Sequence, residues 1–250
     1  MRSKRRTAVV TALLLVFIAA AALFLATGGA GQIKHYVNRR LALTRIDDAD
    51  LREAFAQMSE KNPEAEAFLE GYDGIEEFDL TLDQTDLLEP GAVPYLLQWD
   101  DRWGYCQYGA GLMGWTGCGP TALSMVAMAL TGDGTLTPAR IASFAIDEGY
   151  CVPGHGTAWT LFSEGAEKLG LQARELPLWE ASIRSELQAG RPVICVMGPG
   201  HFTDSGHYIV LTGCDEQGFS VLDPFRPSNC KVWRYEDIQD QINNLWSYSG

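Results

Sequence analysis

The pattern of hydrophobic and polar residues divides the chain into three parts of different character. Thr7–Ala26 is an unbroken stretch without a charged side chain, and a short basic segment precedes it. Residues 32–90 are polar, acidic and spaced as short helices, and from Ala92 onward the chain is richer in aromatic residues and glycine. We therefore predict a membrane anchor or signal segment over residues 1–31, an acidic helical stalk or lead-in over 32–90, and one globular domain over 91–250.

Three helices in the last part have recognisable starts and ends. One is predicted from Thr137 to Gly149, where a threonine cap and a glycine stop enclose an amphipathic run. A second is predicted to be capped by Thr157 and to end at Gly170. A third is predicted over Leu178–Ala189.

Strands dominate the sequence after these helices. Pro192–Met197 is continuously apolar, and the runs His207–Thr212 and Phe219–Leu222 flank the turn sequence DEQG. Two apolar runs joined by such a short turn are typical of an antiparallel hairpin. Helices first and an antiparallel sheet afterwards predict an α+β fold, not alternating βαβ units.

The charge of the chain narrows its partners. The net charge is -13, with 19 Lys and Arg against 32 Asp and Glu. Four of the basic residues lie before Thr7, so the rest of the chain carries -17. Such an acidic surface repels phosphate backbones, and we expect no nucleic acid as a partner.

The basic start and the apolar run together predict a membrane segment. The twenty residues Thr7–Ala26 match the thickness of a bilayer core. A cleaved signal peptide remains the alternative, since small residues follow the run, but its apolar region is usually shorter. The positive charges ahead of the run place the remaining chain outside the membrane, either anchored by one span or secreted.

The six cysteines show no spacing typical of a zinc site. We expect neither a metal nor a cofactor. Cys195 and Cys214 lie in apolar runs that are typical of buried free thiols. If one cysteine is a nucleophile, the other five cannot all form pairs.

Cys118 is the cysteine with chemical character. It lies in the sequence GCGPT directly before an apolar helical run, so it is predicted at a helix N-terminus. The positive end of the helix dipole would favour a thiolate there. The neighbouring glycines, Gly117 and Gly119, would let a substrate backbone approach closely. A structural cysteine entering a buried helix is the alternative interpretation.

A base and a group to orient it are predicted on the hairpin. His207 opens one strand and Asp223 follows the end of the other, so antiparallel pairing brings them to the same edge. A cysteine nucleophile needs such a base, and the base needs an orienting partner. His201 and His155 lie in loops without a predicted partner and are weaker candidates.

Several segments in this order resemble the peptidase C39-like cysteine peptidases, a branch of the papain-like superfamily. The matching segments are LLQWDDRWGYCQYG, GWTGCGPTALSM, GHGTAW, PGHFTDSGHYIVLTG and GFSVLDP, which lie between Tyr95 and Pro224. The resemblance implies a papain-like fold, with the nucleophile at a helix N-terminus packed on an antiparallel sheet. It implies Cys118 as nucleophile, His207 as base, Asp223 as orienting residue and Gln98 in the oxyanion hole.

The expected activity is hydrolysis of peptide bonds in a peptide or protein substrate. Two alternatives stay open at this point. The same residues could support cell-wall amide hydrolysis or transpeptidation, or the domain could be an inactive module that displays a peptide groove. The sequence indicates neither the substrate nor the oligomeric state.

Overall fold

The computed structural model describes residues 29–152, 154 and 156–250. The apolar run Thr7–Ala26 and His155 lie outside the described residues. Among the helices that are described, none combines the length and hydrophobicity that a membrane span requires. Contacts divide the chain into a unit that ends at Ala56 and a second unit, Gln57–Gly250.

The first unit contains α2 (Gly29–Leu43) and most of α3 (Ala49–Lys61). Arg39 donates to the backbone oxygen of Ala56 at 3.1 Å, and Arg52 donates to that of Ile46 at 2.7 Å. The first bond joins the two helices directly, and the second joins α3 to the turn between them.

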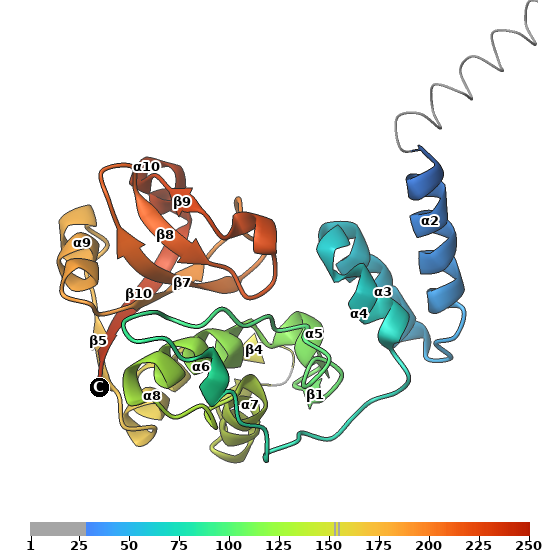
Figure 1. Cartoon of the computed structure of the whole chain (residues 1–250), viewed down its shortest axis with the longest axis horizontal. Coiled ribbons are helices and arrows are strands. Elements are labelled where there is room, and N and C mark those ends of the chain that lie inside the picture. Colours follow the sequence, from blue (N-terminus) through green and yellow to red (C-terminus); the bar gives the residue numbers. More distant parts are fainter. Residues whose placement is uncertain (1–28, 153, 155) are drawn as a thin grey trace, which may run out of the picture. The chain divides into compact units, whose positions relative to one another are not determined.

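The second unit is an α+β domain whose helices precede most of its strands (Figure 1). Its α-helices are α4 (Glu66–Gly71), α5 (Met113–Thr116), α6 (Cys118–Thr131), α7 (Pro138–Asp147), α8 (Glu164–Lys168), α9 (Glu180–Gln188) and α10 (Tyr235–Ile238). Its 3₁₀ helices are η1 (Pro63–Ala65), η2 (Thr85–Leu87), η3 (Trp159–Phe162), η4 (Pro227–Asn229) and η5 (Gln239–Gln241).

The main sheet is antiparallel throughout, with the order β5-β10-β6-β7-β8-β9. Its strands are β5 (Gln172–Glu175), β6 (Val193–Met197), β7 (His207–Cys214), β8 (Phe219–Leu222), β9 (Val232–Trp233) and β10 (Ile242–Ser249). Two small ladders lie outside it, β1 (Gln107–Tyr108) with β2 (Gly111–Leu112), and β3 (Cys151–Val152) with β4 (Gly156–Thr157). The α+β class and the antiparallel sheet are confirmed.

Both faces of the sheet are covered, and this explains why Pro192–Met197 is continuously apolar. Ile194 and Val196 of β6 pack in the core that contains α6 and α7. Val193 and Cys195 point to the other core, which contains α9 and α10. A strand buried on both faces carries no polar alternation, because successive side chains leave the backbone on opposite sides.

The predicted helix boundaries hold in two of three places. Thr137 caps α7 by accepting from the backbone N–H of Arg140 at 3.3 Å, and α9 lies inside the third predicted range. The second prediction is wrong: Thr157 belongs to β4, and the segment after it forms the short η3 and α8. The hydroxyl of Thr157 bonds Tyr108 instead of a helix end.

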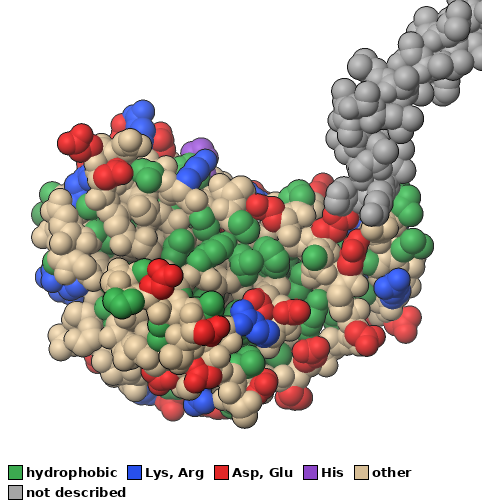
Figure 2. All heavy atoms as spheres, in the orientation of Figure 1, with side chains coloured by type: hydrophobic (Ala, Val, Ile, Leu, Met, Phe, Trp, Pro, Cys, Tyr) green, Lys and Arg blue, Asp and Glu red, His purple; other side chains and the backbone are tan. Residues whose placement is uncertain are grey.

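Acidic side chains are spread over the face of the molecule in Figure 2, with fewer basic ones among them. This distribution agrees with the excess of Asp and Glu in the composition. A surface of this kind favours cationic partners through long-range attraction.

Candidate active site

Cys118 is the first residue of α6, directly after Gly117. The helix runs for 14 residues, and its next ten residues are buried. Cys118 itself is half-buried. A helix of this length directs a positive partial charge and unpaired backbone N–H groups toward its first turn.

His207 and Asp223 meet at one edge of the β7–β8 hairpin. The strands are antiparallel, with Val210 opposite Leu222, so the start of β7 lies beside the end of β8. The imidazole Nε2 of His207 is 2.7 Å from Oδ1 of Asp223. Both side chains are buried, Asp223 completely. The predicted hairpin therefore brings the predicted base and its partner into contact.

Asp223 is held by more bonds than the one to His207. Its Oδ1 accepts from the backbone N–H groups of Phe225 at 2.8 Å and Arg226 at 3.1 Å. Its Oδ2 accepts from Nδ2 of Asn229 at 2.7 Å. These three donors fix the position of the carboxylate that contacts His207. Asn229 was not predicted, because only the turn through η4 brings it back to Asp223.

The charged form of His207 is stabilised in this buried pair. Burial opposes a charge on the ring, but the carboxylate of Asp223 and the neighbouring thiol of Cys118 more than offset it and raise the pKa of His207 to about 10. Burial also opposes a charge on Asp223. The contacts with His207, Asn229 and Phe225 outweigh this effect of burial and hold the pKa of Asp223 below its usual range. Both shifts favour an ion pair of imidazolium and carboxylate.

The orientation of the ring leaves one nitrogen for Cys118. Because Nε2 bonds Asp223, Nδ1 is the ring atom available on the other side. The Cys118 side chain is among the groups that stabilise the charged ring. The ring of Phe225 packs edge-on to the imidazole, with centroids 6.4 Å apart. The structure therefore brings the side chains of Cys118, His207 and Asp223 to one site.

Gln98 is buried beside the segment that leads to Cys118. Its Nε2 donates to the backbone oxygen of Gly114 at 3.0 Å, and its backbone N–H donates to that of Pro224 at 2.8 Å. Gly114 lies in α5, one turn before Cys118. An amide nitrogen carries two hydrogens, so one N–H of Gln98 remains for another acceptor.

Thr157 packs against the start of α6 and was missed as a site residue. A methyl group at Gly119 would lie 2.5 Å from Oγ1 of Thr157, so only glycine fits between them. The same hydroxyl is 2.9 Å from the hydroxyl of Tyr108, and Tyr208 donates to the Thr157 backbone oxygen at 2.9 Å. Thr157 thereby locks the helix start onto β4 and β7. The signal in the sequence is the GHGTAW segment, which was interpreted as a helix cap.

His201, the weaker candidate that the structure describes, has other partners. The ring of His201 packs against Trp233, and its backbone N–H donates to Oε1 of Gln241 at 2.6 Å. All six cysteines are free thiols, and Cys195 is completely buried in β6. Within the described part of the chain, no three His, Cys, Asp or Glu side chains are arranged to hold a metal.

Comparison with known proteins gives one family. The model of the Peptidase_C39 like family matches residues 91–250. Two solved structures are similar at low identity. One, from Bacillus anthracis and described as a C39-like peptidase, is 18% identical, with a TM-score of 0.42 over 64% of this chain and 96% of the other.

The second is the peptidase domain of Streptococcus ComA, a bifunctional ABC transporter of a quorum-sensing pathway. It is 23% identical, with a TM-score of 0.40 over 54% of this chain and 91% of the other. The search of curated proteins found no match.

Proposed function

We infer that this chain is a cysteine peptidase, because it belongs to the Peptidase_C39 like family. We propose Cys118, His207 and Asp223 as its catalytic residues. The observation that carries the assignment is the buried His207–Asp223 pair at 2.7 Å, with Cys118 close enough to the ring to stabilise its charged form. This arrangement of a nucleophile, a base and an orienting carboxylate is the one that acyl transfer requires.

In the proposed reaction the sulfur of Cys118 attacks the carbonyl carbon of the scissile peptide bond. Before this attack the thiol proton already resides on Nδ1 of His207 as the imidazolium, and the imidazolium later gives it to the nitrogen of the leaving amine. The C–N bond breaks, and the acyl half of the substrate remains as a thioester on Cys118. Water then attacks the thioester with His207 as base, which releases the acid and restores the thiol.

Two donors are proposed for the oxyanion of the tetrahedral intermediates. One is the backbone N–H of Cys118 in the first turn of α6, and the other is the remaining N–H of the Gln98 amide. The bond from Gln98 to Gly114 supports the second donor, because it fixes the amide plane next to the helix that carries the nucleophile.

Rapid alkylation near neutral pH is expected at Cys118 alone. A neighbouring imidazolium and a helix start both favour a thiolate. Burial raises the pKa of four other thiols, in the case of Cys106 to about 12. The other three are Cys151, Cys195 and Cys230.

Brief treatment of the full chain with iodoacetamide, followed by peptide mass mapping, measures the selectivity. Cys214 is half-buried at the end of β7 and is the internal control for accessibility. Equal labelling of all six thiols, or preferential labelling of Cys106, would contradict the assignment of Cys118.

We further propose that Thr7–Ala26 anchors the chain in the cell membrane with the catalytic domain outside. The support is the length of the apolar run and the basic residues ahead of it. Protease treatment of intact cells is expected to digest the chain after residue 31. If the domain is protected until the cells are lysed, the proposed orientation is wrong.

The activity is tested by incubating the full chain with a peptide library and identifying the cleaved bonds by mass spectrometry. The same library with an added amine nucleophile separates hydrolysis from transpeptidation, because only the latter gives new amide products. An absence of cleavage, together with an absence of reaction with thiol-directed activity probes, would overturn the proposed function.

A further inference from the structure

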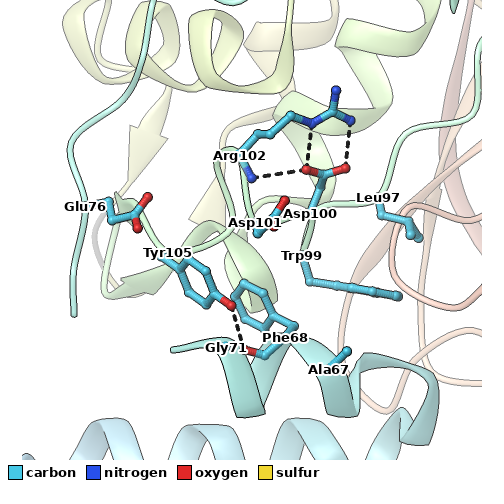
Figure 3. A pocket seen from close by; sticks show the side chains of 10 residues that line it. All are labelled: Ala67, Phe68, Gly71, Glu76, Leu97, Trp99, Asp100, Asp101, Arg102 and Tyr105. Atoms are coloured by element: carbon cyan, nitrogen blue, oxygen red, sulfur yellow. Dashed lines mark hydrogen bonds and ion pairs between the residues drawn. The ribbon is translucent and has the colours of Figure 1, made fainter. Parts of the chain in front are cut away.

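A pocket lies between α4 and the loop that follows Gln98 (Figure 3). Its volume is about 660 Å³, within the range of sites that take small ligands or side chains. Two segments form it, one before the family-matched region and one inside it. The lining residues are Ala67, Phe68, Gly71, Glu76, Leu97, Trp99, Asp100, Asp101, Arg102 and Tyr105.

The aromatic walls of the pocket are held in place. The rings of Phe68 and Tyr105 stack with centroids 4.3 Å apart and an interplanar angle of 6°. The hydroxyl of Tyr105 donates to the backbone oxygen of Phe68 at 2.8 Å. The indole Nε1 of Trp99 donates to the backbone oxygen of Phe225 at 2.7 Å. Phe68 and Tyr105 are buried by this stack, so the half-buried ring of Trp99 is the aromatic surface that a ligand can reach.

The carboxylates of the pocket exceed its basic groups. Arg102 is the basic residue of the lining, and it is already bound to Asp100 by bonds of 2.8 and 2.7 Å and to the side chain of Gln84. Glu76 and Asp101 form no ion pair with any Lys or Arg in the described part of the chain. Burial, Asp101 and Glu76 together raise the pKa of Tyr105 to about 12, which agrees with both carboxylates lying near its ring.

The backbone fixes Glu76 at this position. Its N–H donates to the backbone oxygen of Tyr105 at 3.2 Å, and the residue forms a parallel bridge with Cys106. The segment before the family-matched region thus supplies a carboxylate as well as one aromatic wall.

The pocket adjoins the candidate active site through Trp99. Trp99 directly follows Gln98 and bonds the backbone of Phe225, which is two residues after Asp223. The N–H of Phe225 donates to Asp223, and its ring packs on His207. Trp99 and Phe225 thus connect the pocket to the candidate active site.

We propose that this pocket binds the side chain of a lysine or arginine of the peptide substrate. The proposal rests on the proposed peptidase function and adds a substrate preference to it. An aliphatic stem would lie on the half-buried ring of Trp99, and the cation would be attracted by the exposed carboxylates of Glu76 and Asp101. A cation over an aromatic face and in contact with carboxylates gains from both interactions when water is excluded.

Binding to the full-length Cys118→Ala variant tests the pocket without turnover. The probes are fluorescent peptide pools in which each position in turn is fixed as arginine, lysine, citrulline or norleucine. At one position we expect arginine and lysine peptides to bind at least about tenfold more tightly than citrulline and norleucine peptides. The preference should weaken as salt is raised, since it is electrostatic.

The double substitution Glu76→Gln and Asp101→Asn is expected to remove this preference. The matched control is Glu164→Gln with Glu216→Gln, two exposed acidic residues outside the lining, and it should retain the preference. Equal binding of arginine and citrulline peptides at every position, or a preference that survives the pocket substitutions, overturns the proposal. Thermal unfolding of both double variants checks that they fold.

These outcomes separate the pocket from the proposed reaction. Cleavage of peptides without any preference for a cation would remove the pocket and leave the peptidase function standing. A cation preference in binding, together with no cleavage by the unmodified chain, would retain the pocket and remove the peptidase function.

Discussion

Cys118→Ala is expected to lower peptide hydrolysis by about 10⁴-fold or more. Without the sulfur no thioester forms, and only the oxyanion donors and substrate binding remain to assist attack by water. Cys118 is half-buried and lies at the end of its helix, so the smaller side chain should leave folding nearly unchanged. Turnover of a cleaved library peptide and thermal unfolding, measured side by side, give both quantities.

Two further variants control this experiment. Cys118→Ser keeps the size of the side chain but replaces the sulfur with a weaker nucleophile, and it is expected to be nearly as inactive. Cys214→Ala removes another half-buried thiol, one whose Sγ faces the backbone oxygen of Arg184 at 4.0 Å, and should retain full turnover. Retained hydrolysis in both Cys118 variants would exclude this residue as the nucleophile.

Asp223→Asn is expected to lower turnover by about ten- to a thousand-fold, less than the loss of the nucleophile. The asparagine can still accept from His207 through its oxygen, but it carries no charge to stabilise the imidazolium. The pKa of His207 should therefore fall from about 10, and the alkaline limb of the pH–rate profile should move to lower pH. A purely structural role of Asp223 would not move that limb.

The neighbouring Asn229 offers a matched control for stability. Its Nδ2 donates to Oδ2 of Asp223, so an amide introduced at position 223 requires Asn229 to turn its own oxygen inward. We expect a loss of melting temperature of only a few degrees. Combining Asp223→Asn with Asn229→Asp restores an amide–carboxylate pair, and it should recover stability while turnover stays low.

Two results would contradict the role of Asp223. Unchanged turnover in Asp223→Asn would remove the residue from the site. A collapsed unfolding transition in the same variant, restored together with activity in the double variant, would make the residue structural.

The parts of the site that the sequence predicted are those determined by local pattern. A cysteine followed by Gly-Pro and an apolar run predicts the start of α6, whichever part of the fold the helix packs against. A short turn between two apolar runs specifies the β7–β8 hairpin, and the hairpin by itself brings His207 to Asp223. Neither inference required knowledge of distant contacts.

The parts that were missed depend on contacts between distant segments. β10 lies between β5 and β6, but its sequence INNLWSYS has no clear alternation that distinguishes it from a loop. Thr157 precedes an apolar run and is of a residue type that caps helices, so local pattern predicts a cap. The structure instead pairs it with Cys151 in a short ladder, and its bonds to Tyr108 and Tyr208 span 49 and 51 residues of chain.

The segment from Gln57 to Pro90 also takes its place from distant contacts. Its composition predicted a stalk or lead-in, and the described structure includes it in the same unit as the family-matched region. Nδ2 of Asn62 donates to the backbone oxygen of Phe225 at 2.5 Å, across 163 residues. Only the structure shows that this segment contacts the loop after Asp223 and contributes four of the ten residues that line the pocket.

The central claim is that peptide bonds are cleaved through an acyl intermediate on the sulfur of Cys118. A single-turnover reaction of the full chain with a cleaved library peptide, quenched in acid and mapped by mass spectrometry, tests it most directly. The account predicts that the peptide containing Cys118 gains the mass of the acyl half of the substrate, and that hydroxylamine removes it. Cleavage that proceeds with no such adduct, and that continues in Cys118→Ala, would contradict the account.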